Sequence, residues 1–450
     1  MPLPGRDQRP GAGLGDHVQT TVAGHEGRGA GGGLPVLPYQ QPPGPVRLFY
    51  GDLLLQDGGD QRLRHQAGTG QPQPGAAVAG QRDEAVAGGE GVGFVVGAEE
   101  RGQGLQQPLG ARAPRRHVID APAVTGTPAV IPVWEWENPP EDADVSRAGR
   151  TLVSMADVAM LRAARAHYEL MYRRAGGVAT RARIVGFLNA ETAPLLRGSY
   201  GDALGRQLHR ATGGLVAVAG ICAYDSDVHG LAQRYFHQAL RLAKASGDRG
   251  LGAYVIALLV NQSLFLSEHR QAVAFAEAAL RTAGGQITPA LSADLYAMQA
   301  KAYAHLGDDA SALRCIRRAE TEAERIHLGD EPDETGYVQP GLVNVQAAEA
   351  LLSLGDLTAA REHASAAAGT PAHDRGRVHR LAMLCQIELR QGEADRAAAT
   401  AAEMTERVRG MESQRLRDRL RAVREHLLAS GSASAEDAAG LIDEALRVPL

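Results

Sequence analysis

The sequence predicts an all-α fold made of stacked helical pairs, preceded by a long segment that contributes no domain. From Met155 onward the 450-residue chain is rich in Ala and Leu, and its apolar residues recur at the three- and four-residue spacing of helices. An internal repeat also occurs five times in the second half of the chain. Residues 1–145 show neither feature.

The segment of residues 1–145 has the composition of a chain that cannot fold by itself. Its first 130 residues hold 27 of the 54 glycines, and 17 of the 23 prolines lie before Asp142. Glycine loses the most backbone entropy on ordering and proline removes a hydrogen-bond donor, so folding would cost more than it returns. The segment also lacks Ser, Lys and Cys, whereas residues 146–450 hold 15 serines. Two interpretations stay open: a natural disordered tail, or non-native sequence from a GC-rich gene read in the wrong frame or from too early a start.

The repeat consists of a turn, an anchoring alanine, an apolar or small residue four positions later, and in most copies a small residue three positions after that. The anchors lie 40, 40, 48 and 37 residues apart, at Ala232, Ala272, Ala312, Ala360 and Ala397. In three copies a glycine-acid pair begins five residues before the anchor. The glycine is expected to end one helix and the acid to lie in the first turn of the next. Small anchors indicate a close crossing of the two helices, and the longest spacing predicts a loop over residues 326–340.

This pattern resembles the tetratricopeptide repeat over roughly residues 214–408, although the usual aromatic positions are degenerate. The resemblance implies a solenoid in which each helical pair buries its apolar face on its neighbours. We therefore divide the chain into 1–145, flanking helices in 146–213, repeats in 214–408 and capping helices in 409–450. Flanking helices are expected at 155–174, 178–196 and 202–212, and the Arg-rich stretch 405–428 is expected to be a cap.

Several short motifs carry a family resemblance: Met155-Ala156-Asp157-Val158, Ala193-Pro194-Leu195-Leu196-Arg197-Gly198, Gly220-Ile221-Cys222-Ala223-Tyr224-Asp225 and Gly230-Leu231-Ala232-Gln233-Arg234-Tyr235-Phe236. Through them, residues from about 134 to 450 resemble the C-terminal part of actinobacterial, Streptomyces-type transcriptional regulators. Those proteins carry a phage-repressor-type helix-turn-helix before a tetratricopeptide-like sensor, and some regulate sporulation or antibiotic production. The resemblance implies DNA binding through that module. Residues 1–130 show no helix-turn-helix, so no residue here is assigned to DNA.

The concave groove of the solenoid is the candidate site, because first helices of such pairs line it and a peptide or protein partner lies there. Setting the copies in register places eleven residues on this face: Tyr224, Tyr254, Asn261, Phe265, Asp294, Lys301, His305, Glu349, His379, Gln386 and Arg390. Asn261 and Lys301 fall where related modules hold a peptide carboxylate, whereas Met298 replaces one polar residue of that clamp. The alternative is a groove that packs only against its own domain.

Composition and motifs argue against several other functions. A net charge of −5 and 4% aromatic residues argue against a nucleic-acid coat. No apolar run approaches the length of a membrane span. The chain has three cysteines, Cys222, Cys315 and Cys385; we expect them to be free thiols packed like small apolar residues, as in a protein of the reducing cytoplasm. The phosphate-loop, nucleophile-elbow and HExxH motifs are missing. We therefore expect no enzyme activity, no cofactor and no metal.

Two polar clusters have a structural and a functional interpretation. Asp225, Asp227, His229 and His237 lie around a turn, where capping is favoured over metal binding. Seven arginines alternate with acids over residues 407–425, which favours a solvated helix over a homodimer or nucleic-acid contact. The sequence thus indicates a non-enzymatic sensor module of a transcriptional regulator. The rival is a stand-alone tetratricopeptide scaffold with no role linked to DNA.

Overall fold

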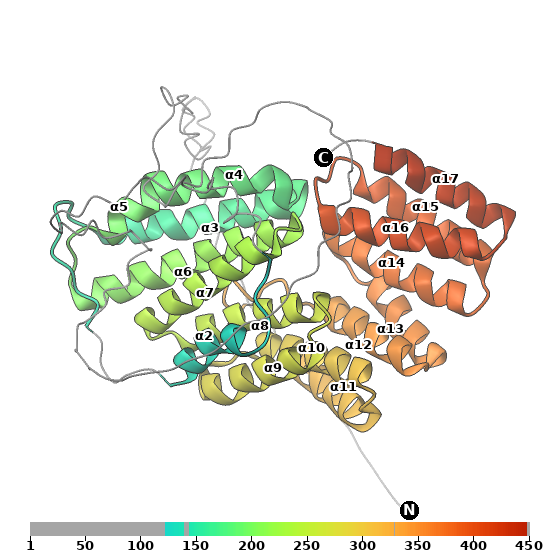
Figure 1. The fold of residues 1–450 in the computed structure, drawn as a ribbon, viewed down its shortest axis with the longest axis horizontal. Helices are drawn as coiled ribbons and strands as arrows, with labels where there is room; N and C mark the ends of the chain where they lie inside the picture. The colour runs from blue at the N-terminus through green and yellow to red at the C-terminus, as the bar shows by residue number, and fades with distance from the viewer. Residues whose placement is uncertain (1–121, 139–143, 328, 448–450) are drawn as a thin grey trace, which may run out of the picture. The chain divides into compact units, whose positions relative to one another are not determined.

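A computed structural model describes residues 122–138, 144–327 and 329–447 (Figure 1). The predictions for residues 1–121 lie outside this part of the chain. Within the described residues the fold is all-α, as predicted, and extended pairing is limited to two isolated bridges, Arg147–Tyr200 and Leu152–Ser199. None of the described helices has the length and apolarity needed to cross a membrane.

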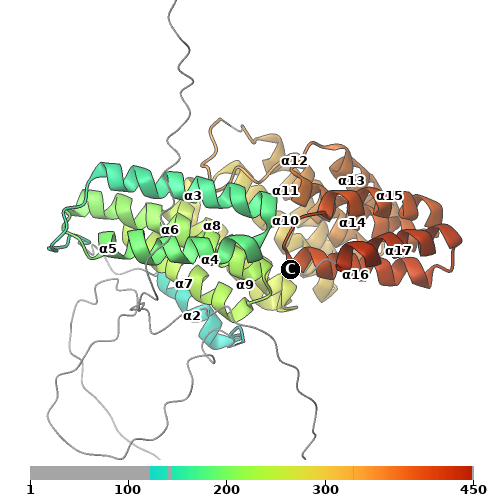
Figure 2. The same cartoon turned by 90° about the horizontal axis from the view of Figure 1, so that it is seen from above.

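The helices pack in consecutive antiparallel pairs that follow a short N-terminal group. That group comprises α2 (Thr127–Glu137), α3 (Met155–Ala175), α4 (Gly177–Phe187), a π-helical turn (Leu188–Thr192) and α5 (Ala193–Leu196). The pairs are α6 (Asp202–Asp225) with α7 (His229–Ser246), α8 (Arg249–Phe265) with α9 (His269–Ala283), α10 (Pro289–Leu306) with α11 (Asp309–Glu324), α12 (Pro340–Leu354) with α13 (Leu357–Gly369), α14 (Asp374–Arg390) with α15 (Ala394–Val408), and α16 (Gln414–Ala429) with α17 (Ala433–Arg447). Two views show the last pair beside α14 and α15 (Figure 1, Figure 2).

The predicted repeat register is confirmed by burial. All five anchoring alanines are 0% exposed, each in the second helix of a pair. The glycines of the glycine-acid pairs have positive φ, as at Gly307 (75°), and so end the first helix in a left-handed conformation. The acid lies one position earlier than expected, because Asp308 is the N-cap itself and accepts a hydrogen bond from the Ser311 amide (3.0 Å).

Three expected helices differ from those observed. The helix expected at 202–212 continues to Asp225, so residues 213 and 214 lie inside α6. The helix expected at 178–196 is interrupted by the π turn after Phe187. The stretch 405–428 is not one helix, because α15 ends at Val408 and α16 begins at Gln414. The loop expected at 326–340 is observed between α11 and α12.

Helix α2 lies inside the segment 1–145, where no helical period was predicted. It packs against α7 and α9 and buries Ala129, Val133 and Trp136, a spacing of four and three residues. A side chain at Gly252 would bring its Cβ within 2.1 Å of Trp136 Nε1, so the indole lies directly on α8. The folded array therefore includes residues before 145.

The beginning and the end of the array touch each other. The amide of Glu412 donates to the Ala175 carbonyl (2.8 Å), and the Glu412 carbonyl accepts from the Val178 amide (3.2 Å). Gly176, at φ 93°, allows this approach, since a Cβ there would lie 2.2 Å from the Glu412 carbonyl oxygen. The α3–α4 turn is thus joined by backbone hydrogen bonds to the segment between α15 and α16.

A buried ion pair reinforces this contact. Asp225, at the end of α6, is 0% exposed and pairs with Arg375 of α14, which is 5% exposed. The Asp225 carboxylate also accepts hydrogen bonds from Ser413 Oγ (2.8 Å) and the Gly177 amide (2.7 Å). We call Asp225, Arg375, Ser413 and Gly177 the closing cluster. It joins four parts of the chain, and its members Asp225 and Ser413 are 188 residues apart in sequence.

Candidate functional site

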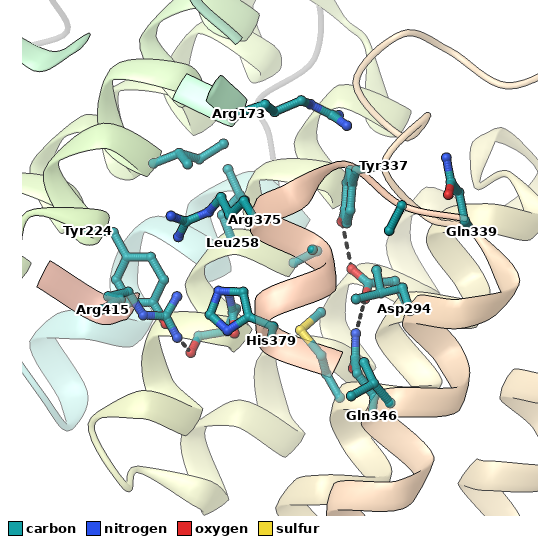
Figure 3. Close-up of a pocket in the computed structure, with 18 of the residues that line it drawn as sticks. Arg173, Tyr224, Leu258, Asp294, Tyr337, Gln339, Gln346, Arg375, His379 and Arg415 are labelled. Carbon is teal, nitrogen blue, oxygen red and sulfur yellow. Dashed lines mark hydrogen bonds between the residues drawn. The ribbon is translucent and has the colours of Figure 1, made fainter. Parts of the chain in front are cut away.

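The first helices of the pairs line a cavity of about 300 Å³ (Figure 3). Helices α6, α8, α10, α12 and α14 provide most of its wall, and residues of α3, α7, α16 and the segments before α12 and α14 provide the rest. The apolar part of the lining is aliphatic and aromatic, with Val218, Ile221, Phe236, Ala257, Leu258, Met298, Leu342, Val345 and Met383. The space is therefore surrounded by the repeat array rather than filled by it.

Seven of the eleven residues predicted for the groove line this cavity: Tyr224, Tyr254, Asn261, Asp294, Lys301, Glu349 and His379. The other four do not. Phe265, His305 and Arg390 belong to the last turns of their helices, and Gln386 is one turn before the end of α14, so all four lie beyond the cavity. His305 instead stacks on His269, with 4.5 Å between the ring centroids. Whether the seven bind a partner stays a prediction.

One end of the cavity holds a buried carboxylate with neutral partners. Asp294 is 3% exposed and accepts hydrogen bonds from the Tyr337 hydroxyl (2.6 Å) and the Gln346 side-chain amide (2.7 Å). Burial raises the pKa of Asp294, against the opposite effect of these hydrogen bonds. Gln346 is 8% exposed, and its Oε1 is buried without a hydrogen-bond partner among the described residues. This end therefore offers an unused acceptor.

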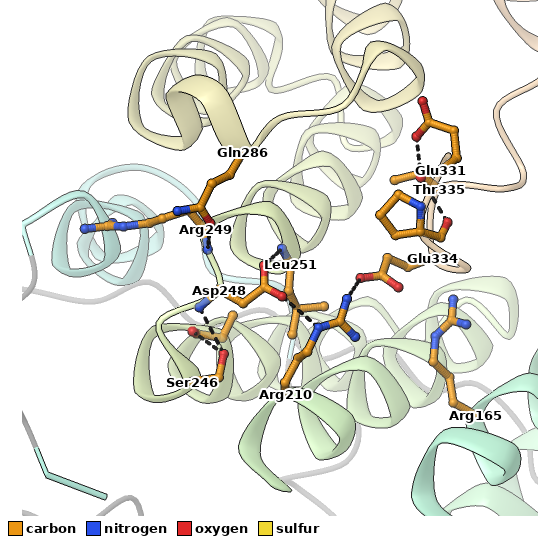
Figure 4. Close-up of polar contacts among 12 residues, drawn as sticks. Arg165, Arg210, Ser246, Asp248, Arg249, Leu251, Gln286, Glu331, Glu334 and Thr335 are labelled. Carbon is orange, nitrogen blue, oxygen red and sulfur yellow. Dashed lines mark hydrogen bonds and ion pairs between the residues drawn. The ribbon is translucent and has the colours of Figure 1, made fainter. Parts of the chain in front are cut away.

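Residues of the 326–340 loop build this end of the site, which the sequence did not predict. Glu334 is 6% exposed and pairs with Arg210 (2.7 Å), whose guanidinium also pairs with Asp248 (2.7 Å) (Figure 4). Glu331 accepts hydrogen bonds from the Ala290 amide (3.0 Å) and the Thr335 hydroxyl (2.9 Å). These contacts hold the loop against α6, α8 and α10 and so position Tyr337 at the cavity.

The middle of the cavity is occupied by an ion pair. Lys301 Nζ lies 2.9 Å from Glu349 Oε2. Burial has the largest effect on Glu349 and raises its pKa, but Lys301 and Arg419 together outweigh it, so the pKa is lowered and the carboxylate is charged. Lys301 was expected to hold a peptide carboxylate together with Asn261. In the structure the carboxylate beside Lys301 is that of Glu349. The backbone carbonyl of Asn261 accepts a hydrogen bond from the Tyr224 hydroxyl (3.3 Å).

The opposite end of the cavity is basic. The Arg415 guanidinium lies over Tyr224 at 4.0 Å from the ring centroid and at 5.0 Å from that of Phe265. Arg415 and Arg419 make no hydrogen bond or ion pair with any residue that the structure describes, and Nε of Arg415 is buried. Burial, Arg375 and Arg419 hold the pKa of His379 well below its usual range, so its imidazole is neutral at pH 7.

These two arginines correct the interpretation of the Arg-rich stretch as a solvated face. Arg421 and Arg424 pair with Asp418 and Asp443, and Arg417 donates to the Leu446 carbonyl. Arg415 and Arg419 instead project into the cavity. Their four-residue spacing places them on one helix face, beside the buried stripe of Leu416, Leu420, Val423 and Leu427. That spacing is the sequence signal that could have identified them.

The residues around the α6–α7 turn and the three cysteines make contacts that stabilise the fold. Asp225 was expected to cap a helix, but it is a buried member of the closing cluster because Arg375 compensates its charge. Asp227 pairs with His229 (2.8 Å) at the turn itself, where its φ is 63°. In the described part of the chain no three His, Cys, Asp or Glu side chains are grouped as metal ligands would be. Cys222, Cys315 and Cys385 are buried thiols, as predicted from their positions in repeat helices.

Comparison with known proteins adds no further identification. No family model matches this chain, and no curated protein matches it.

Proposed function

We propose that this chain is a non-enzymatic regulatory protein of the cytoplasm whose helical repeats bind a ligand in the cavity lined by their first helices. The observation that carries the proposal is the cavity, because it gathers seven residues from five repeat pairs around a space that the array leaves open. Its volume of about 300 Å³ suits a short peptide or another molecule of that size. A folded partner protein would have to bind elsewhere on the array.

The contact between the two ends of the array supports a sensing role. Arg375 lines the cavity and also belongs to the closing cluster, so one guanidinium touches both the ligand space and the contact between α6 and α14. A ligand that interacts differently with the closed and the opened array shifts the balance between them. The sequence resemblance to transcriptional regulators suggests that an attached DNA-binding module reads this balance.

A cavity-filling variant tests the binding function. Leu258 lines the cavity from α8, and Leu258→Trp places an indole in the ligand space. Leu313→Trp is the matched control, because Leu313 is 39% exposed on α11 and does not line the cavity. Short peptides and metabolites should be screened by thermal unfolding. Ligands are expected to raise the midpoint of the parent chain and of Leu313→Trp, but not that of Leu258→Trp.

The alternative function is a stand-alone scaffold with tetratricopeptide-like repeats. Ligands or proteins that bind Leu258→Trp as tightly as the parent chain would favour the scaffold. The regulatory part of the proposal has a separate test in the coding DNA. A helix-turn-helix in another reading frame that ends near residue 134 would support the regulator, and open frames without one would favour the scaffold.

A further inference from the structure

The basic side chains that line the cavity outnumber their acidic partners at one of its two ends. Three basic side chains have an acid each: Arg173 pairs with Glu169 (2.5 Å), Lys301 with Glu349 (2.9 Å) and Arg375 with Asp225. A fourth, Arg380, donates to carbonyl oxygens, that of Thr370 at 2.9 Å. Arg415 and Arg419 have no such partner among the described residues, so positive charge is left over at the α16 end.

The surroundings of these two arginines retain that positive charge for a ligand. Arg415 is fixed by stacking on Tyr224 and Phe265, which directs the guanidinium without using its N–H donors in hydrogen bonds. His379, which lines the same cavity and whose pKa both arginines help to lower, contributes a neutral ring rather than a negative charge. The labelled side chains in Figure 3 show Arg415 beside Tyr224 and His379 facing the same space.

The rest of the wall defines the remainder of the ligand. Between the two ends the lining combines the Lys301–Glu349 ion pair, whose charges compensate each other, with aliphatic side chains such as Leu258, Met298 and Val345. At the far end the buried Oε1 of Gln346 has no donor from any described residue, and a buried acceptor without a donor is costly unless a ligand supplies one. An amphipathic molecule with one anionic end therefore matches the cavity.

We propose that the ligand carries an anionic group, a carboxylate or a phosphate, on an apolar body, and that Arg415 and Arg419 bind this group. The apolar body lies against the aliphatic wall. A hydroxyl or N–H at its far end donates to Gln346 Oε1. The inference rests on the proposed function, since it names the ligand class of the same cavity. The binding arginines then come from α16, outside the five repeat pairs, and differ from the clamp expected at Asn261 and Lys301.

Four probes with the same apolar body test the class of ligand. Octanoate and octyl phosphate carry the two anionic groups, 1-octanol is neutral and octylamine is cationic. Isothermal titration calorimetry on the full chain should show the anionic probes binding about tenfold more tightly than octanol, and octylamine most weakly. The tighter of the two anions identifies the group as carboxylate or phosphate.

Single variants on one helix assign the site. Arg415→Gln and Arg419→Gln are each expected to weaken binding of the tighter anion about tenfold, while leaving the affinity for octanol unchanged. Arg421→Gln is the matched control, because Arg421 lies on α16 outside the cavity and its removal changes the net charge equally. Arg419→Lys should restore part of the affinity, which a folding defect would not do.

The outcomes separate this inference from the proposed function. Octanol binding as tightly as the anions, or anion binding that is insensitive to both Arg→Gln variants, would overturn the anionic ligand and leave the cavity as a binding site. If no probe binds the parent chain, both the inference and the proposed binding function are contradicted. A loss of affinity in Arg421→Gln equal to that in Arg419→Gln would show a general charge effect and overturn the assignment to α16.

Discussion

Removal of the Asp225 carboxylate should separate the two ends of the array. In Asp225→Ala the buried guanidinium of Arg375 loses its counter-charge, and Ser413 Oγ and the Gly177 amide lose an acceptor. Breaking one side of a buried ion pair costs about 3–5 kcal/mol, because the remaining charge is left uncompensated. The cost falls on the contact that joins the α3–α4 turn and the end of α6 to α14 and the α15–α16 segment.

Amide hydrogen exchange measures this effect at the contact itself. Repeat arrays often unfold in parts, so a single unfolding midpoint is a poor measure of a local contact. The Val178 and Glu412 amides both donate across the contact. If their exchange requires opening of the contact, about 3–5 kcal/mol corresponds to exchange that is faster by roughly a hundredfold to a few thousandfold. The Ala312 amide, which bonds within its own helical pair, should change little.

Two further variants test whether loss of the Asp225–Arg375 ion pair causes the faster exchange. Asp418→Ala removes an exposed carboxylate that pairs with Arg421 on α16, and surface pairs contribute little, so exchange should change less than tenfold. Asp225→Ala combined with Arg375→Ala leaves no unpaired buried charge, so its effect should be clearly smaller than the sum of the two single variants. Strict additivity, or unchanged exchange of Val178 in Asp225→Ala, would refute the argument that this pair holds the ends together.

Three other variants test the packing and the cavity. Ala312→Leu overfills a fully buried helix crossing and should cost about 1–3 kcal/mol in urea unfolding, whereas Ala310→Leu, exposed on the same helix, should be nearly neutral. Gly252→Ala should displace Trp136 from α8 and shift its fluorescence to longer wavelength; an unshifted spectrum would show that α2 does not pack there. The pKa of Asp294 is raised in the folded state, so folding favours the protonated carboxyl; this contribution to stability is present at low pH and is lost as the pH rises through the folded-state pKa. Asp294→Asn has no such titration, so in urea unfolding its stability relative to the parent chain should increase from pH 4 to pH 7.

The repeat could be predicted from sequence because its determinants are local. Each anchoring alanine is followed by its apolar partner four residues later, and the helix ends before it are marked by Gly307 or Gly355 at positive φ. Such signals need only the neighbouring turn of helix. They predicted the second helices of all five pairs and the loop after α11.

Contacts between distant parts of the chain gave no such signal. Asp225 lies at the end of a helix and precedes a turn, so its sequence surroundings are those of a capping residue. Its charged partner, Arg375, is 150 residues away, and only the folded array brings the two together. Helix α2 was missed for a related reason: its eleven residues contain two prolines, and it packs on α7, α8 and α9, more than ninety residues later.

The candidate site combines both kinds of information. Register alone brought seven residues to the cavity, because first helices of successive pairs present equivalent positions to one face. The same reasoning could not find Arg415 and Arg419, which belong to the helix after the repeats, nor Tyr337, which belongs to the inserted loop. Helix α16 and the inserted loop both lie outside the regular repeat pattern. At one end the irregular elements supply two cations that have no ion-pair partner among the described residues, and at the other end they supply the hydroxyl that donates to Asp294. Ligand selectivity should therefore depend on α16 and the 326–340 loop more than on the repeat positions between them.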